Sequence, residues 1–165
     1  MQAELCGVTL HYEQYGQGDR HVLMLHGWGC EIKHFAPIAD SLQSDYHITV
    51  IDFPAHGQST PPPQPWGVAD FAACVKALIL QLGIAPCDII AHSFGGRVAL
   101  YLAANEPQLV KRLVLTGCAA LPIAFAAKNQ ACSGAWLGLR ADHGAGLFFT
   151  PAILRQQLQG MTNGR

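Results

Sequence analysis

Residues 88–105 read DIIAHSFGGRVALYLAAN, a short apolar run that is followed by a helical segment, with a serine at the junction. The run 88–91 is typical of a buried strand, and residues 97–105 are expected to form a helix. Small neighbours of Ser93 allow the backbone to bend sharply there and to expose the hydroxyl group. The stretch therefore predicts a strand, a tight turn and a helix, with Ser93 as a candidate nucleophile. The alternative is a serine that merely caps the helix.

The segments around this stretch alternate in the same way between apolar runs and helical patterns. The expected strands are residues 4–8, 10–15, 21–25, 47–53, 88–91 and 113–115. The first two are expected to form a hairpin turned at Gly7. The clearest helix is Val68–Leu82, whose apolar residues recur at helical spacing and which Gly83 ends. This order predicts an α/β fold, a mostly parallel sheet with helices on both faces.

The composition describes one apolar domain and excludes several classes of function. The chain has 165 residues, 50% of them hydrophobic and 13% charged, with a formal net charge of -1. Intrinsic disorder is excluded, and scattered basic residues leave no surface for nucleic acid. Six cysteines without a C-x-x-C pair are expected to be free thiols in a reducing cytoplasm. No run is long enough to cross a membrane, and no histidine spacing predicts a metal site.

Two further loops are expected beside Ser93, because the carboxyl ends of parallel strands meet at one edge of a sheet. Residues 26–29 read HGWG after the strand 21–25, and residues 52–59 read DFPAHGQS at the end of the strand 47–53. In open α/β sheets, ligands bind at this edge. An N–H group from the 26–29 loop could join the N–H of Phe94 in binding the negative oxygen of a tetrahedral intermediate.

The blocks LHGWG (25–29), DFPAHGQS (52–59) and AHSFGG (91–96) together resemble the α/β-hydrolase family, in the family's order and at its usual intervals. The chain departs from the family pattern at Ala91 and Ala55, where glycine is more usual. The resemblance covers residues 10–117. A serine at the turn argues against the relatives that use aspartate there, such as dehalogenases and epoxide hydrolases.

The resemblance implies a serine hydrolase of carboxylic esters or related acyl compounds that uses no cofactor. Ser93 is then the nucleophile, and the backbone N–H groups of Trp28 and Phe94 form the oxyanion hole. HGWG is also similar to the carboxylesterases that act on acyl-carrier or small methyl esters. The residues implied to support the motif, rather than to react, are His26, Gly27, Gly29, Gly95 and Gly96. His56 is implied to shape its loop.

A base and an acid for Ser93 are harder to find. In the family both follow the serine, and here the only candidates after Ser93 are Glu106, Asp142 and His143. Glu106 lies about 15 Å away at the far end of the helix. Asp142 and His143 are adjacent, so their side chains point in different directions. We therefore expect slow or absent turnover by this chain alone, or a non-catalytic binding protein, or a partner chain that supplies the base.

The chain is expected to divide into a core at residues 1–118 and a cap at residues 119–165. The second part has few charges, is rich in alanine and glycine, and shows no convincing strand; its clearest helix is Pro151–Leu158. Members of the family continue past the cap with two more strands. Without them, the strand at 113–115 would be an exposed apolar edge, which predicts self-association. The simplest interpretation is the N-terminal portion of an α/β-hydrolase.

Overall fold

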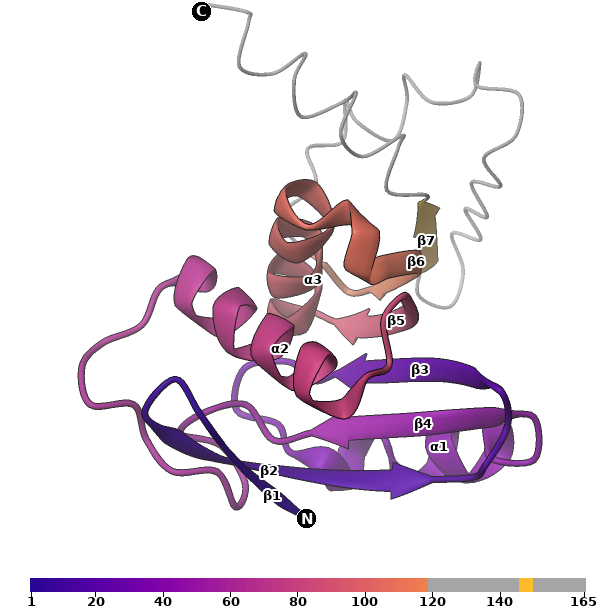
Figure 1. The fold of residues 1–165 in the computed structure, drawn as a ribbon, viewed down its shortest axis with the longest axis horizontal. Helices are drawn as coiled ribbons and strands as arrows, with labels where there is room; N and C mark the ends of the chain where they lie inside the picture. Colours follow the sequence, from indigo (N-terminus) through magenta and orange to yellow (C-terminus); the bar gives the residue numbers. More distant parts are fainter. Residues whose placement is uncertain (119–145, 150–165) are drawn as a thin grey trace, which may run out of the picture.

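A computed structural model describes residues 1–118 and 146–149, which form one seven-stranded sheet (Figure 1). The strands are β1 (Gln2–Leu5), β2 (Val8–Tyr15), β3 (Arg20–Leu25), β4 (Tyr46–Ile51), β5 (Cys87–His92), β6 (Val110–Thr116) and β7 (Gly146–Phe149). Their order is β1-β2-β4-β3-β5-β6-β7. The four central strands β4, β3, β5 and β6 are parallel, whereas β1, β2 and β7 run antiparallel to their neighbours. The predicted α/β fold is confirmed.

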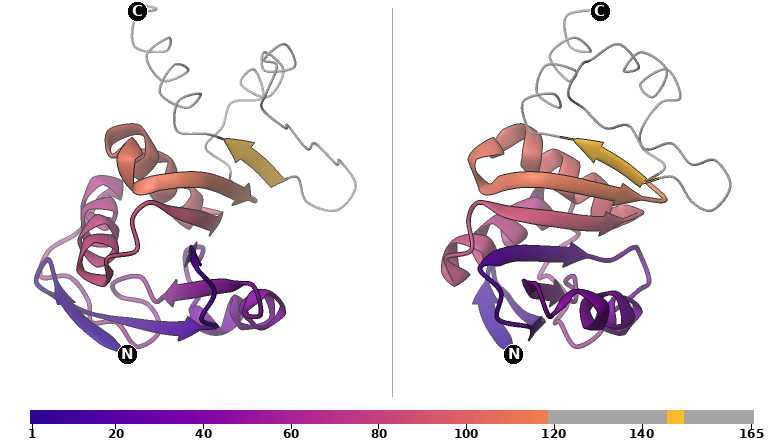
Figure 2. Two further views of the ribbon diagram at one scale, coloured as in Figure 1. Left: turned by 45° about the vertical axis from the view of Figure 1, so that its right-hand side comes forward. Right: turned by 90° about the vertical axis from the view of Figure 1, so that its right-hand side faces the viewer.

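Helices cover both faces of the sheet (Figure 2). They are α1 (Ala36–Leu42), α2 (Val68–Leu82) and α3 (Phe94–Asn105), with short 3-10 turns at Ile32–His34 and Pro107–Leu109. Side chains alternate along β3: Val22 and Met24 pack on the α1 side, and Leu23 and Leu25 pack with α2 and α3. A strand that is buried on both faces is continuously apolar, which explains the run in the sequence.

The helix α2 has the bounds that its apolar spacing predicts. At its start, the Asp70 carboxylate accepts a hydrogen bond from the Gly67 N–H group at 2.8 Å. At its end, Gly83 adopts a left-handed conformation with φ 64°. Glycine reaches this conformation at little cost and so closes the helix.

The N-terminal hairpin turns at Cys6 and Gly7, two residues with φ of 52° and 80°. Leu5 pairs with Val8, so only two residues form the loop. Positive φ at both positions is the pattern of the type I′ turn, whose twist matches that of the strands. The hairpin is confirmed, but β1 ends at Leu5 rather than at Val8.

Two predictions about the far side of the sheet are wrong. β7 runs antiparallel beside β6 and places Phe149 opposite Leu113 and Gly146 opposite Thr116. The strand that contains Leu113 is therefore not an edge, and residues 119–165 do contribute a strand. The reason is that β7 has only four residues, too few to show an alternating pattern. The rest of the predicted cap, including Pro151–Leu158, lies outside the described residues, and self-association stays a prediction.

Within the described ranges, every helix is too short or too polar to cross a membrane.

Candidate active site

Ser93 lies at the turn between β5 and α3, at the carboxyl edge of the parallel strands. Its backbone has φ 49° and ψ -112°, a conformation that is strained for a residue with a side chain. The Ser93 N–H group donates to the carbonyl of Thr116 at 2.9 Å, and the Ser93 carbonyl accepts the N–H group of Gly96 at 3.0 Å. Hydrogen bonds on both sides thus hold the sharp turn, and the Ser93 side chain is half-buried.

The start of α3 lies directly on the end of β3, and only glycine fits the contact. The Gly95 N–H group donates to the carbonyl of His26 at 3.1 Å. A Cβ atom at Gly95 would lie 2.3 Å from the carbonyl oxygen of Leu25, too close for any side chain. At Gly27, a Cβ atom would lie 3.2 Å from the Cβ of Ser93. These two glycines therefore bring the 26–29 loop next to the candidate nucleophile.

The remaining glycines of the motif have separate reasons. A Cβ atom at Gly96 would lie 2.9 Å from the Sγ of Cys118, two residues after β6 ends. Gly29 has open space around it but a φ of 73°. It sits in a turn that closes when the Cys30 N–H group donates to the carbonyl of Gly27 at 3.1 Å.

Two backbone N–H groups of this region are the ones that the resemblance implies for an oxyanion hole. Phe94 is the first residue of α3, so its N–H group has no partner within the helix. The turn at residues 27–30 uses the N–H group of Cys30 and leaves that of Trp28. Phe94 directly follows Ser93, and the N-terminal end of α3 adds a partial positive charge there.

Four aromatic rings border the turn, and we call them the aromatic cluster: Trp28, Phe53, Phe71 and Phe94. The ring of Phe94 meets those of Trp28, Phe53 and Phe71 edge to face, with centroids 5.3, 5.5 and 5.1 Å apart. Trp28 is 67% exposed, whereas Phe53 and Phe71 are buried. The cluster joins α2 and α3 to the loops that follow β3 and β4, and offers an apolar surface beside Ser93.

His26 connects these two loops through both ring nitrogens. Its Nδ1 donates to the carbonyl of Gly27 at 2.7 Å, and its Nε2 accepts the backbone N–H group of Phe53 at 3.0 Å. Only the neutral ring can do both. Burial lowers the pKa of His26 and so favours this state. Because both nitrogens are engaged, His26 is unavailable as a base for Ser93.

The loop at 52–59 is organised by a buried carboxylate, a role that sequence reasoning missed. Asp52 accepts the N–H groups of Ile32 and Gln58 at 2.8 and 2.9 Å, and its Oδ2 lies 2.9 Å from the Nδ1 of His11. A Cβ atom at Gly57 would lie 2.2 Å from this carboxylate. The signal in the sequence is an aspartate at a strand end, five residues before a glycine.

His56 shapes the same loop. It is buried, its Nδ1 pairs with the carbonyl of Pro54 at 3.0 Å, and its ring lies edge to face with that of Trp28 at 4.9 Å.

A family model for the alpha/beta hydrolase fold matches residues 20–139, nearly three quarters of the chain. The chain belongs to the α/β-hydrolase fold family. The match begins at the first residue of β3 and includes the turn at Ser93.

Individual relatives agree with this assignment. The chain is 32% identical over 123 residues to the dihydrolipoyllysine-residue acetyltransferase component of the acetoin cleaving system of Cupriavidus necator, covering 74% of this chain and 32% of that protein. It is 37% identical over 97 residues to the pimeloyl-(acyl-carrier protein) methyl ester esterase of Neisseria meningitidis, covering 59% of this chain and 36% of that protein. An epoxide hydrolase from Vigna radiata superimposes with a TM-score of 0.67 at 25% identity, covering 70% of this chain and 37% of that one. The chain thus spans about a third of the length of these relatives.

No base engages the Ser93 hydroxyl in the described part of this α/β-hydrolase. Within residues 1–118 and 146–149 we find no hydrogen bond to the Ser93 hydroxyl. His92 is exposed, and its Nδ1 lies 3.1 Å from the hydroxyl of Thr116. Asp142 and His143 lie outside the described residues. In the same part of the chain, no group of three or more His, Cys, Asp or Glu residues could hold a metal ion.

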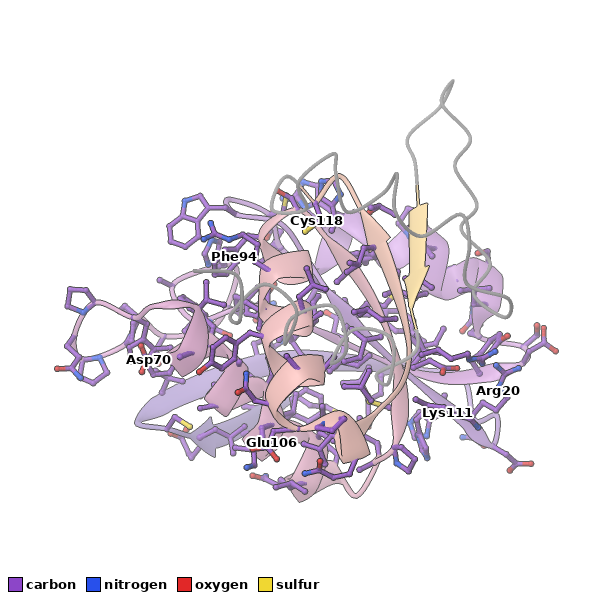
Figure 3. All side chains as sticks on the ribbon, turned by 90° about the horizontal axis from the view of Figure 1, so that it is seen from above. Arg20, Asp70, Phe94, Glu106, Lys111 and Cys118 are labelled. Atoms are coloured by element: carbon purple, nitrogen blue, oxygen red, sulfur yellow. The ribbon has the colours of Figure 1, made fainter. Side chains whose placement is uncertain are left out.

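Glu106 has a structural role far from the turn. Figure 3 shows Phe94 and Glu106 at opposite ends of α3. Glu106 pairs with Lys76 of α2, and this hydrogen bond holds the pKa of Glu106 below its usual value. The residue therefore joins two helices.

Proposed function

We propose that Ser93 is the nucleophile of a serine hydrolase that acts on carboxylic esters or related acyl compounds. The observation that carries the proposal is the backbone of Ser93, held at φ 49° between β5 and the first residue of α3, Phe94. Such a turn costs folding free energy, and it presents the hydroxyl at an open edge where neighbouring amides can bind an oxyanion.

The proposed reaction has two steps. The Oγ of Ser93 attacks the acyl carbonyl carbon, and the carbonyl oxygen gains a negative charge that the two amides bind. The alcohol then leaves, and the acyl group remains as an ester on Ser93. Water attacks this acyl-enzyme and releases the acid, which restores the serine.

Both steps need a base that takes and returns a proton. A hollow of about 150 Å³ lies beside the turn, lined in part by Gly27, Cys30, His92 and Thr116. We propose that residues outside the described part, or a partner chain, supply this base. Without such a base the reaction is slow, because loss of one triad member typically lowers kcat by about 10⁴ to 10⁶.

Among esters, we propose methyl esters of acyl groups as the substrate class. We also propose that the protein acts in the cytoplasm. Two observations support this class. The chain is similar to an esterase of a carrier-bound methyl ester, and the largely exposed Trp28 extends the apolar surface beside Ser93. The widely spaced free thiols of Cys30, Cys87 and Cys118 support a reducing compartment.

A non-catalytic binding protein is the second candidate, because no described group would activate Ser93. A fluorophosphonate probe separates the two, since it reacts with an activated serine and not with an ordinary hydroxyl. Labelling that is lost in Ser93→Ala and kept in Ser44→Ala, which changes an exposed serine outside the site, would support the hydrolase and show that the chain supplies a base. Equal labelling of Ser93→Ala and the unchanged chain would reject Ser93 as the nucleophile. No labelling of either would favour the binding protein.

A further inference from the structure

Two histidines lie side by side at the amino ends of β3 and β4, the edge of the sheet opposite to Ser93. His21 and His47 are paired directly in the register of these two parallel strands. Their ring centroids are 5.0 Å apart, and the ring planes are tilted by 44°. His26, in the loop beside Ser93, follows the other end of β3, roughly 16 Å away along an extended strand. The histidine pair is therefore separate from the candidate active site.

The ring of His21 carries a nitrogen atom that has no hydrogen-bond partner. Among the described residues, its Nδ1 is the one buried side-chain nitrogen or oxygen atom without such a partner. Buried polar atoms are nearly always paired, so an unpaired one calls for an explanation such as a bound water molecule or ion. His21 and His47 as whole residues are only half-buried, so a small ion can reach the two rings from solvent.

The charge state and the surroundings of the two rings favour a cation. Burial lowers the pKa of His21, and the neighbouring His47 lowers it further. The neutral ring, whose nitrogen lone pair can bind a metal ion, is therefore the favoured form. The positive charge of Arg20 lies on the opposite face of β3, because successive side chains of a strand alternate. There its guanidinium group lies 4.8 Å from the ring centroid of Tyr46 and donates to Asp88 at 3.4 Å.

We propose that His21 and His47 together bind one zinc ion. In a tetrahedral zinc site the metal lies about 2.0 to 2.1 Å from each ring nitrogen, which places two ring centroids roughly 5 Å apart. The distance of 5.0 Å between these two rings agrees with that geometry. Imidazole nitrogen is also a ligand that zinc favours. This site does not depend on the proposed hydrolase chemistry.

Two imidazole rings leave two positions of the ion for water. Structural zinc sites use four protein ligands and catalytic ones use three, and the described ranges contain no group of three or more His, Cys, Asp or Glu residues that could hold a metal. The proposed site is therefore one of moderate affinity, from which the ion exchanges with the medium. The ion bridges β3 and β4 only in the folded chain, so the melting temperature should rise with the zinc concentration.

Calorimetric titration of the full chain with zinc chloride tests the proposal. The protein is prepared without a polyhistidine tag and freed of metal with a chelator that is then removed. Its accessible thiols are alkylated, because free thiolates would also bind zinc. We expect one zinc ion per chain and a higher melting temperature in parallel thermal melts. Magnesium, which prefers oxygen ligands, should give neither effect. A melting temperature that zinc does not raise, with no heat of binding, would overturn the proposal.

Four variants complete the test, each first shown by circular dichroism to fold without metal. His21→Gln and His47→Gln should each weaken zinc binding by about tenfold or more, since changing even an outer partner of a metal ligand costs that much. The double variant should lose little more than either single one, because a single ion needs both rings. His34→Gln is the matched control, since His34 is an exposed histidine outside the pair.

His47→Gln decides alone if His21→Gln does not fold. Equal zinc affinity of the native chain and folded His47→Gln would contradict the assignment, as would an equal loss of affinity in His34→Gln.

Discussion

The Nε2 of His26 accepts the backbone N–H group of Phe53 at 3.0 Å, and this bond joins the loop after β3 to the loop after β4. The first loop carries Trp28, and the second begins at the buried Asp52. The position of a proposed oxyanion donor therefore depends on a histidine that must stay neutral.

Stability should fall when the medium protonates His26. Burial lowers the pKa of His26 in the folded state, whereas the pKa of the same side chain in the unfolded chain is about 6.5. The unfolded state then binds more protons below this pH. The stabilisation is complete above about pH 6.5 and is lost as the pH falls below it, until the folded protein is protonated too.

Thermal melts between pH 7.5 and 5.5 measure this effect. His26→Gln keeps an acceptor near the Phe53 N–H group but cannot be protonated, so its melting temperature should fall less with pH than that of the unchanged protein. His21, whose pKa burial also lowers, titrates in both proteins and cancels in the comparison. Parallel pH profiles for the two proteins would show that His26 is not the group responsible.

Gly95→Ala should destabilise the protein far more than Gly29→Ala. At Gly95 a Cβ atom would lie 2.3 Å from a backbone oxygen, and the helix would have to move, at a cost of about 3 kcal/mol. At Gly29 there is open space, and only the left-handed conformation costs about 1 kcal/mol. Urea unfolding gives both free energies. Equal losses would mean that α3 does not lie directly on the end of β3.

The features that sequence reasoning found are those that depend on neighbouring residues. The apolar spacing of residues 68–82 determined the bounds of α2, and the small residues around Ser93 predicted its turn. By contrast, His11 and Asp52 are 41 residues apart and meet only because β2 and β4 pair. Nothing local in either residue indicates the other.

The missed strand has a similar explanation. Residues 146–149 read GLFF, which is too short for a strand pattern. They form a strand because the edge of β6 offers unpaired N–H and carbonyl groups.

Asp52→Asn should cost more stability than Asp70→Asn. The Asp52 carboxylate is buried and accepts two backbone N–H groups beside the His11 ring, so an amide NH₂ group would face a donor without a partner. We expect a loss of about 1 to 3 kcal/mol. Asp70 is exposed and accepts one N–H group at the start of α2, which is worth about 0.5 to 1 kcal/mol. Urea unfolding of both variants decides between them, and a smaller loss at Asp52 would refute its role in organising the loop.

The chain alone should hydrolyse p-nitrophenyl acetate slowly. Its oxyanion amides and binding surface can retain roughly 10³ over the rate in water, whereas a missing base lowers kcat by about 10⁴ to 10⁶. Ser93→Ala should therefore reduce a low rate only modestly, and the absorbance of p-nitrophenolate measures both proteins. Ser44→Ala, which changes an exposed serine outside the site, is the control for hydrolysis by co-purified enzymes and by other groups on the protein surface. Rapid turnover that Ser93→Ala abolishes would show that this chain already holds a base, and the residues outside the described part, His143 first, would be the place to look for it.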